Sequence, residues 1–181
     1  MEILIRDPVP DDVAAFLERR RRWGADHRDE VWDGVLHLNP VPAMAHSLIC
    51  TQLVRVLHPL GRAAGLVASG EFNLGDEPNF RVPDLGLQRE PSMGVWHERA
   101  ALVVEVLSQR DETFEKLPFY ARHGVEELVI VEPRERSVRW LALAEGEYRP
   151  LEHSALVELG PRELAGQLDW PEARQDTAAR V

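Results

Sequence analysis

Lysine and cysteine are almost missing from this chain of 181 residues. Lys116 is the only lysine, and the other 20 of the 21 basic residues are arginines. Cys50 is the only cysteine, so no internal disulfide can form, which fits a reducing compartment. It lies among Leu48, Ile49 and Leu53, and this setting predicts a small core residue. The arginine bias makes lysine rare here, but it does not by itself give Lys116 a role.

Long apolar runs are missing as well. No stretch approaches the roughly 20 apolar residues that a membrane-spanning helix needs. The first eight residues lack the basic start and apolar centre of a signal peptide. We therefore expect a cytoplasmic protein with no membrane association.

Positive charge is also scarce, since the net charge is −10. This argues against broad, non-specific DNA affinity, which depends on neutralising phosphates, but it leaves room for a local basic face. A carboxylate cluster that needs a cation would add to the acidity. The length predicts one domain with a sizeable core, which we place at residues 1–171, followed by a loose polar tail at 172–181.

The first third of the chain predicts two helices around a hairpin. A helix starts at Asp11 or Asp12, either of which can be its N-cap, and ends in the four arginines at 19–22. Those arginines fit a solvated face better than a nucleic-acid patch. Asp33-Gly34 predicts the turn of a hairpin over 30–38. Apolar spacing predicts a helix over 43–64, which Pro59 should kink or end early.

The rest of the chain alternates strands with helices. Strand patterns cover 66–74, 80–88, 100–107 and 127–131, and a terminal hairpin follows at 138–143 and 148–151. A helix is expected near 113–123, closed by Gly124, and at most one short helix in the last twenty residues. The strand–helix–strand unit at 100–131 predicts a parallel pair. The expected class is α+β, with a mixed sheet flanked by helices.

Glu105 interrupts a strand that is otherwise apolar on both faces, so this strand should lie inside the sheet. A carboxylate there is costly to bury unless it is paired or bound to a metal. The alternatives are an ion pair with an arginine or a place at the wet end of the strand. The strand alone does not decide between these interpretations.

Asp84 follows Pro83, which cannot donate to a strand ladder, so Asp84 should lie near an edge or a bulge. Gly86 shares its face and leaves room for a close approach. The alternative is an ordinary turn aspartate.

Lys116 shares a helix face with Glu112 and Tyr120, at a spacing of four residues. The common interpretation of such a lysine is an exposed Glu–Lys pair worth a few tenths of a kcal/mol. Pro118 predicts either a helix that starts near Lys116 or a kink there.

These pieces in order resemble the Uma-type (DUF820-like) family of putative restriction endonucleases, a branch of the PD-(D/E)XK nuclease superfamily. The resemblance covers roughly residues 10 to 150. It is carried by Pro83-Asp84, the run at 103–108, the Lys116-xxx-Tyr120 segment that continues to Leu128, and the upstream motifs at 30–34 and 42–46.

The resemblance implies a restriction-endonuclease-like mixed central sheet, a DNA substrate, and Mg²⁺ or Mn²⁺ as cofactor. It implies Asp84, Glu105 and the backbone carbonyl of Val106 as metal ligands. The usual lysine position, two residues after the acidic ligand, holds Leu107, and the resemblance places the lysine on the following helix, at Lys116.

Three features depart from the family pattern. The 108–116 connection is short, Glu112 stands where an aspartate is common, and Pro118 is unexpected.

The resemblance adds Glu30 and His46 to the expected site. Lys116, with its pKa lowered by the cation, would orient or deprotonate a water. Glu30 would complete the metal shell or hold a water. His46 would contact the phosphate or act as an acid, although a histidine at a helix start is more often a cap or packing residue.

Three hypotheses follow. The first is a metal-dependent DNA endonuclease, which we expect to be a homodimer or higher homo-oligomer because a duplex needs two cuts. The second is a catalytically silent nuclease fold that binds nucleic acid or a protein partner, which the −10 charge favours. A hydrolase using Cys50 or a serine is disfavoured because no nucleophile elbow or Cys/His spacing is found. Zinc is disfavoured because seven scattered histidines and one cysteine show no ligand spacing.

Overall fold

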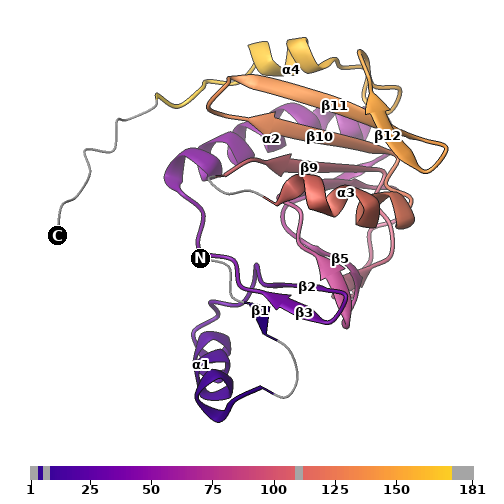
Figure 1. Cartoon of the computed structure of the whole chain (residues 1–181). Helices are drawn as coiled ribbons and strands as arrows, with labels where there is room; N and C mark the ends of the chain where they lie inside the picture. Colours follow the sequence, from indigo (N-terminus) through magenta and orange to yellow (C-terminus); the bar gives the residue numbers. More distant parts are fainter. Residues whose placement is uncertain (1–3, 6–8, 109–111, 173–181) are drawn as a thin grey trace.

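Two six-stranded sheets and four helices form the computed structural model, which describes residues 4–5, 9–108 and 112–172 (Figure 1). The helices are α1 (Asp11–Arg22), α2 (Met44–Ala63), α3 (Thr113–Arg122) and α4 (Pro161–Gly166). The first sheet has the order β1 (Leu4–Ile5), β3 (Val35–His37), β2 (Glu30–Trp32), β6 (Asn79–Arg81), β5 (Asn73–Asp76) and β8 (Trp96–His97). The second has the order β12 (Glu147–Pro150), β11 (Ser137–Ala144), β10 (Glu127–Glu132), β9 (Leu102–Val106), β7 (Leu85–Gln88) and β4 (Val67–Ser69).

The second sheet is built around β9, whose five residues are all buried. This strand pairs parallel with β10 and antiparallel with β7, so the sheet is mixed. The parallel pair joined through α3 confirms the expected strand–helix–strand unit. The mixed α+β class with helices against the sheet is also confirmed.

Helices α2 and α3 pack on opposite faces of the second sheet. Alternate residues of a strand point to opposite faces, and β9 follows this rule. Leu102 and Val104 join the cluster that contains Ile49 of α2, whereas Val103 joins the cluster that contains Phe119 of α3. The carboxylate of Glu105 therefore points to the α3 side.

The strands expected at 66–74 and 80–88 are each divided between the two sheets, so the prediction of two continuous strands is wrong. Strands β4 and β7 belong to the second sheet, and β5 and β6 to the first. Pro83 marks one break, because it cannot donate the hydrogen bond that would continue the ladder between β6 and β7. The chain bends at Gly70 between β4 and β5. The strands therefore form two mixed sheets, where the sequence analysis describes one mixed sheet flanked by helices.

Two helix predictions are corrected. The N-cap of α1 is Pro10, and Asp11 and Asp12 lie in the first turn, where their charges suit the positive end of the helix. Pro59 does not end α2, which continues to Ala63. Its ring lies on the exposed face, while Leu57 and Gly61 on either side are buried. Packing of the buried face therefore outweighs the lost helical hydrogen bond.

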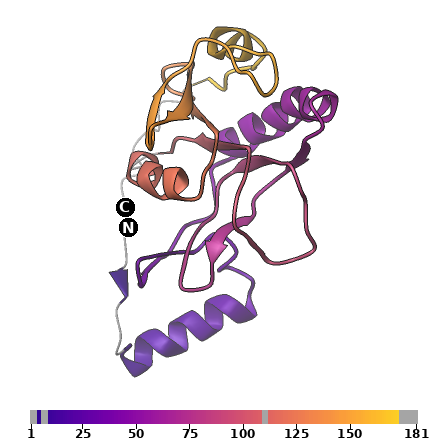
Figure 2. The same ribbon diagram turned by 90° about the vertical axis from the view of Figure 1, so that its right-hand side faces the viewer.

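Helix α1 lies apart from the rest of the molecule in both views (Figures 1 and 2), and none of its residues is buried. Arg20 fixes it to the segment before β2, since its Nη2 donates to Oδ1 of Asp29 at 2.7 Å. No helix within the described part of the chain is long and apolar enough to cross a membrane. The tail expected at 172–181 falls, from residue 173 on, outside the described residues.

The two hairpins form where the sequence predicts them. Asp33 and Gly34 turn between β2 and β3 with φ values of 48° and 83°. Glu145 and Gly146 turn between β11 and β12 with φ values of 53° and 85°. Both turns need positive φ at two successive residues, which matches their Asp-Gly and Glu-Gly sequences.

Candidate active site

Three buried carboxylates meet where the two sheets join. Glu30 begins β2 of the first sheet, and Glu105 lies in β9 of the second. Asp84 lies in the short connection from β6 to β7, which carries the chain from one sheet to the other. Their exposed fractions are 1% for Glu30, 4% for Glu105 and 6% for Asp84. Burial this complete requires partners for all three charges.

Lys116 is the partner of two of them. Its ammonium lies 2.9 Å from Oε1 of Glu30 and 3.1 Å from Oε1 of Glu105. The interpretation as an exposed Glu–Lys pair is therefore wrong, and Glu112 contacts His37 instead, with 3.2 Å between Oε2 and Nδ1. Lys116 lies in the first turn of α3, and Pro118 follows within the same helix. The short connection lets the ammonium reach both carboxylates; residues 109–111 of it lie outside the described residues.

Glu30 is held by the first sheet. The backbone N–H of Val82 donates to its Oε1 at 2.7 Å, and the indole N–H of Trp32 donates to its Oε2 at 2.7 Å. With Lys116 this gives Glu30 three donors. Its carboxylate therefore fixes the lysine at the junction of the two sheets.

Tyr120 lies one helical turn after Lys116 and donates its hydroxyl to Oε1 of Glu105. The sequence predicts Tyr120 on the same helix face as Lys116 but does not indicate its bond to Glu105. The spacing of four residues was the available signal.

Arg81 supports this arrangement from below α3. Its guanidinium lies 4.4 Å from the ring centre of Trp32 and 4.1 Å from that of Phe119. Burial lowers the pKa of Arg81, although the charge of Glu30 opposes this shift. The stacked arginine therefore joins the first sheet, through Trp32, to Phe119 of α3, the helix that carries Lys116.

Asp84 is held by an arginine, a histidine and a backbone N–H. Nη2 of Arg28 lies 2.7 Å from its Oδ1, while Nε2 of His46 at 3.1 Å and the N–H of Val106 at 2.8 Å approach its Oδ2. Arg28 also bonds Glu71. Arg28 was missed, because it lies in an irregular segment with no periodic pattern. His46 is a partner of Asp84, and its expected contact with a phosphate or role as an acid stays a prediction.

Two carboxylate oxygens remain able to bind a cation. Oε1 of Glu105 accepts two donors, but Oε2 accepts none from the residues that the structure describes. Among the described residues, Arg28 alone donates to Oδ1 of Asp84, which leaves one of the two lone pairs of this oxygen. The N–H of Val106 points to Asp84, and the carbonyl of a strand residue points to the same side as its N–H. These oxygen donors suit a hard cation such as Mg²⁺ or Mn²⁺.

The two expected metal ligands differ in acidity. Burial raises the pKa of Asp84, but the hydrogen bond and charge of His46, the Val106 N–H and Arg28 outweigh it, so the pKa is lowered. Burial raises the pKa of Glu105 to about 7, helped by Asp84 and Glu30 and opposed by Lys116 and Tyr120. A cation beside Glu105 would favour its ionised form.

The expectation that a neighbouring cation lowers the pKa of Lys116 stays a prediction, and the protein groups around the ammonium act in the opposite direction. Burial lowers the pKa of its ammonium, but the charges and hydrogen bonds of Glu105 and Glu30 outweigh burial and raise it. In this setting Lys116 is a positively charged donor and not a base.

The family model described as “Uma2: Putative restriction endonuclease” matches residues 14–173. The chain belongs to this family. A crystal structure of “a putative nuclease belonging to DUF820” from Anabaena variabilis is similar, with a TM-score of 0.63 and 17% sequence identity. The similarity covers 77% of this chain and 90% of the other, and at this identity it shows the fold alone. No curated protein matches the chain.

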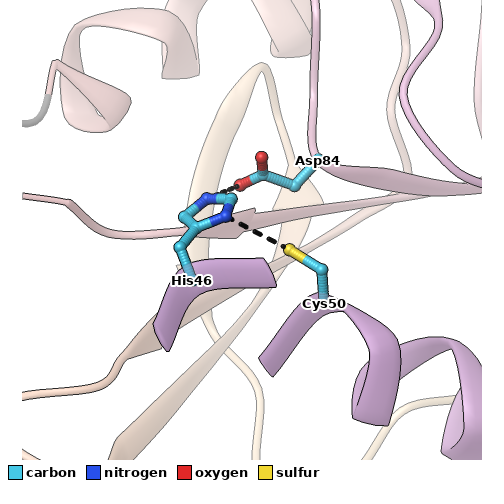
Figure 3. A group of neighbouring side chains, drawn as sticks. All are labelled: His46, Cys50 and Asp84. Carbon is cyan, nitrogen blue, oxygen red and sulfur yellow. Dashed lines mark hydrogen bonds and ion pairs between the residues drawn. The ribbon is translucent and has the colours of Figure 1, made fainter. Parts of the chain in front are cut away.

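Beside the carboxylates, this Uma2 family member has a second cluster of side chains (Figure 3). His46 and Cys50 project from one face of α2, and the ring of His46 lies between Cys50 and Asp84. The distance from Cys50 Sγ to His46 Nδ1 is 3.5 Å. His46 and Cys50 are four residues apart, and residues at this spacing share a helix face, which is a ligand spacing that the prediction of no zinc site overlooked.

Cys50 is only partly buried, and it packs against the core as expected. Burial and the charge of Asp84 raise the pKa of its thiol to about 12. Near neutral pH it is therefore a thiol and not a thiolate, which argues against a nucleophile despite the adjacent histidine.

Gly86 does not leave an empty space beside Asp84. A Cβ at this position would lie 2.5 Å from Cε1 of Phe72, so the ring already occupies the room that glycine provides. The glycine in the Uma2 chain therefore serves packing at the junction of the sheets.

Proposed function

We propose that this protein is a divalent-metal-dependent DNA endonuclease that hydrolyses phosphodiester bonds. The observation that carries the proposal is the position of Lys116. Its ammonium joins Glu30 of one sheet to Glu105 of the other through the Oε1 atoms, and no donor from the described residues occupies Oε2 of Glu105. Two carboxylates with a fixed ammonium can hold a cation and act on a phosphate.

Asp84, Glu105 and the carbonyl of Val106 would hold Mg²⁺ or Mn²⁺. Such a cation lowers the pKa of a water and offsets the charge that develops on the scissile phosphate. The oxygen-rich donor set fits this class of metal.

Lys116, Glu30 and His46 have different roles in the proposed reaction. Lys116 stays positive and donates hydrogen bonds to the attacking water or to a phosphate oxygen. Glu30 contacts Lys116 at 2.9 Å and acts through it as a positioning residue. His46 contacts Asp84 at 3.1 Å and orients that carboxylate. Hydrolysis adds the water oxygen to phosphorus, breaks one P–O bond and leaves a hydroxyl on the departing sugar.

A supercoiled plasmid incubated with purified protein and Mg²⁺ or Mn²⁺ tests the proposal, because one internal cut converts it to the open circle. We expect Asp84→Asn, Glu105→Gln and Lys116→Met each to abolish conversion. Glu90→Gln is the matched control, since Glu90 is exposed and loses the same charge. Conversion that persists in all three variants, or that no metal supports in the parent protein, would contradict the proposal.

A second candidate is a nuclease fold that binds nucleic acid or a partner without cutting. The favouring observation is that Arg28, His46 and Lys116 already pair with Asp84 and Glu105. Titration calorimetry with Mn²⁺ separates the two functions. An endonuclease should bind Mn²⁺ and lose this binding in Asp84→Asn, whereas a silent fold should show DNA affinity without a metal.

We also propose a homodimer or higher homo-oligomer, because cutting both strands of a duplex needs two active sites. Sedimentation with and without a short duplex measures this directly. A monomer in both conditions would contradict it.

A further inference from the structure

His46, Cys50 and Asp84 bring three different ligand types together. One ring nitrogen, one sulfur and one carboxylate oxygen all lie within 4.8 Å of one another. Nitrogen, sulfur and oxygen in one cluster are the donors of zinc sites and are poor ligands for Mg²⁺. The cluster therefore differs in chemistry from the oxygen donors proposed for the catalytic metal.

The separations suit a tetrahedral ion after a small closure. Zn–N bonds of about 2.0 Å and Zn–S bonds of about 2.3 Å place two tetrahedral ligand atoms roughly 3.5 Å apart. Cys50 Sγ lies 3.5 Å from His46 Nδ1, whereas Asp84 Oδ2 lies 3.1 Å from the other ring nitrogen, Nε2. The ring must therefore turn so that a single nitrogen faces both the sulfur and the oxygen. His46 and Cys50 lie one turn apart on the same helix, and the three ligand atoms start within 4.8 Å of one another, so rotation of the His46 ring and of the Asp84 carboxylate would bring a ring nitrogen, the sulfur and the oxygen around one ion.

We propose that His46, Cys50 and Asp84 form a second cation site, selective for a soft divalent ion of the Zn²⁺ type, and that an ion there removes Asp84 from the catalytic site. The regulatory half of this inference rests on the proposed endonuclease function. The metal site itself does not.

The charge of Arg28 and the proton of the Cys50 thiol both affect how an ion could bind. The guanidinium of Arg28 bonds Oδ1 of Asp84, whereas His46 contacts the other oxygen, Oδ2. The positive charge of Arg28 is therefore next to the oxygen that does not face His46. The thiol must lose its proton to the solvent when the sulfur–metal bond forms, and a coordinating thiol is deprotonated by the ion. Cys50 is only partly buried, so both the ion and the proton have a path to water.

Mutual exclusion follows from the shared carboxylate. The Oδ2 lone pairs of Asp84 receive His46 and the N–H of Val106 in the structure. An ion on the helix side would rotate Asp84 toward His46 and Cys50, away from Glu105. Soft cations would then inhibit cleavage supported by Mg²⁺ or Mn²⁺.

Co²⁺ is the probe for the site, because a bound thiolate gives a charge-transfer absorption in the near ultraviolet. We expect this band in the parent protein, its loss in Cys50→Ser and Cys50→Ala, and roughly 10- to 100-fold weaker binding in Asp84→Asn. Circular dichroism checks that both cysteine variants fold, and two different replacements guard against one that does not. A parent protein without the band at saturating Co²⁺, or a band that survives in Cys50→Ser, overturns the metal site.

Plasmid cleavage tests the regulatory half. Cys50→Ser should cleave with Mg²⁺ as the parent does but should need at least about ten-fold more Zn²⁺ for half inhibition. Equal inhibition of both proteins overturns this half. A cobalt band without any cleavage by Mg²⁺ or Mn²⁺ refutes the endonuclease and leaves the metal site in place, so the two failures are distinguishable.

Discussion

Lys116 and Tyr120, one helical turn apart on α3, both donate to the same oxygen of Glu105. The shared Oε1 has no lone pair left, and this directs any further ligand to Oε2. The helix thus orients a carboxylate that the strand alone would leave free to rotate. Four predictions follow from this junction and its surroundings.

Replacing Lys116 by methionine should cost about 3–5 kcal/mol of unfolding free energy, because Glu30 and Glu105 would remain buried without a cation. Urea unfolding followed by circular dichroism measures the loss. Arg134→Met is the control, since it removes one positive charge from an exposed turn and should change stability by less than about 0.5 kcal/mol. Added Mn²⁺ should recover part of the loss in Lys116→Met. Equal stability of the two variants would show that the buried pair is absent in solution.

Tyr120→Phe should destabilise the protein by about 1.5–3 kcal/mol, the range for a hydrogen bond to a charged group. It should also move the pH midpoint of cleavage upward, because the Tyr120 hydroxyl lowers the pKa of Glu105. The other tyrosine supplies a matched control. Tyr148 donates to the carbonyl of Val125 at 2.8 Å, so Tyr148→Phe loses a hydroxyl without touching the site. An unchanged pH profile in Tyr120→Phe would contradict the role of its hydroxyl.

The pKa of Glu105 predicts how pH and metal act together. The folded value of about 7 exceeds the ordinary 4.5, so the folded state binds the proton more tightly than the unfolded state. The contribution of Glu105 to stability is therefore complete below about pH 4.5, declines as the pH rises, and is lost above about pH 7. A divalent cation competes with this proton.

Mn²⁺ should consequently raise the melting temperature more at about pH 8 than at about pH 5.5, as scanning calorimetry can measure. Glu105→Gln has no proton to release, so its smaller Mn²⁺ effect should be nearly independent of pH. A larger metal effect at the lower pH would refute the assignment of Glu105 as a ligand.

Gly86→Ala should cost about 1–3 kcal/mol, because the new Cβ would meet Cε1 of Phe72 at 2.5 Å. Gly70→Ala is its matched control, since nothing lies within 4 Å of a Cβ there. Thermal unfolding compares the two. If Phe72 swings away without cost, the two variants will have the same melting temperature.

The central parts of the site could be predicted from the chain itself. Glu105 stands out because a carboxylate inside an all-apolar strand needs a partner, and Lys116 stands out as the only ammonium. The family motifs then supply Asp84, Glu30 and His46. Periodicity also predicts α2, α3 and β9 close to their observed bounds.

The remaining features depend on contacts between distant segments. Arg28 reaches Asp84 across 56 positions of sequence, from a segment without periodicity. The division of 80–88 between two sheets depends on which neighbours each half finds, and local strand propensity does not encode that choice. Pro83 predicts a break in the strand ladder, but the sequence does not show that the chain after it joins the second sheet.

The separate origins of the carboxylates have a consequence for how the molecule folds. Glu30 comes from one sheet, Glu105 from the other, and Asp84 from the strap between them. Glu105 and Val106 lie in the second sheet and Asp84 directly precedes one of its strands, whereas Glu30 comes from the first sheet, so Glu30 and Glu105 reach the same ammonium when the two sheets are joined. A nascent chain that ends before α3 has no ammonium to pair with the buried acids. Docking of the two sheets and of α3 is therefore needed to pair the charges of Glu30, Glu105 and Lys116, so the stability of this junction depends on segments that are far apart in the sequence.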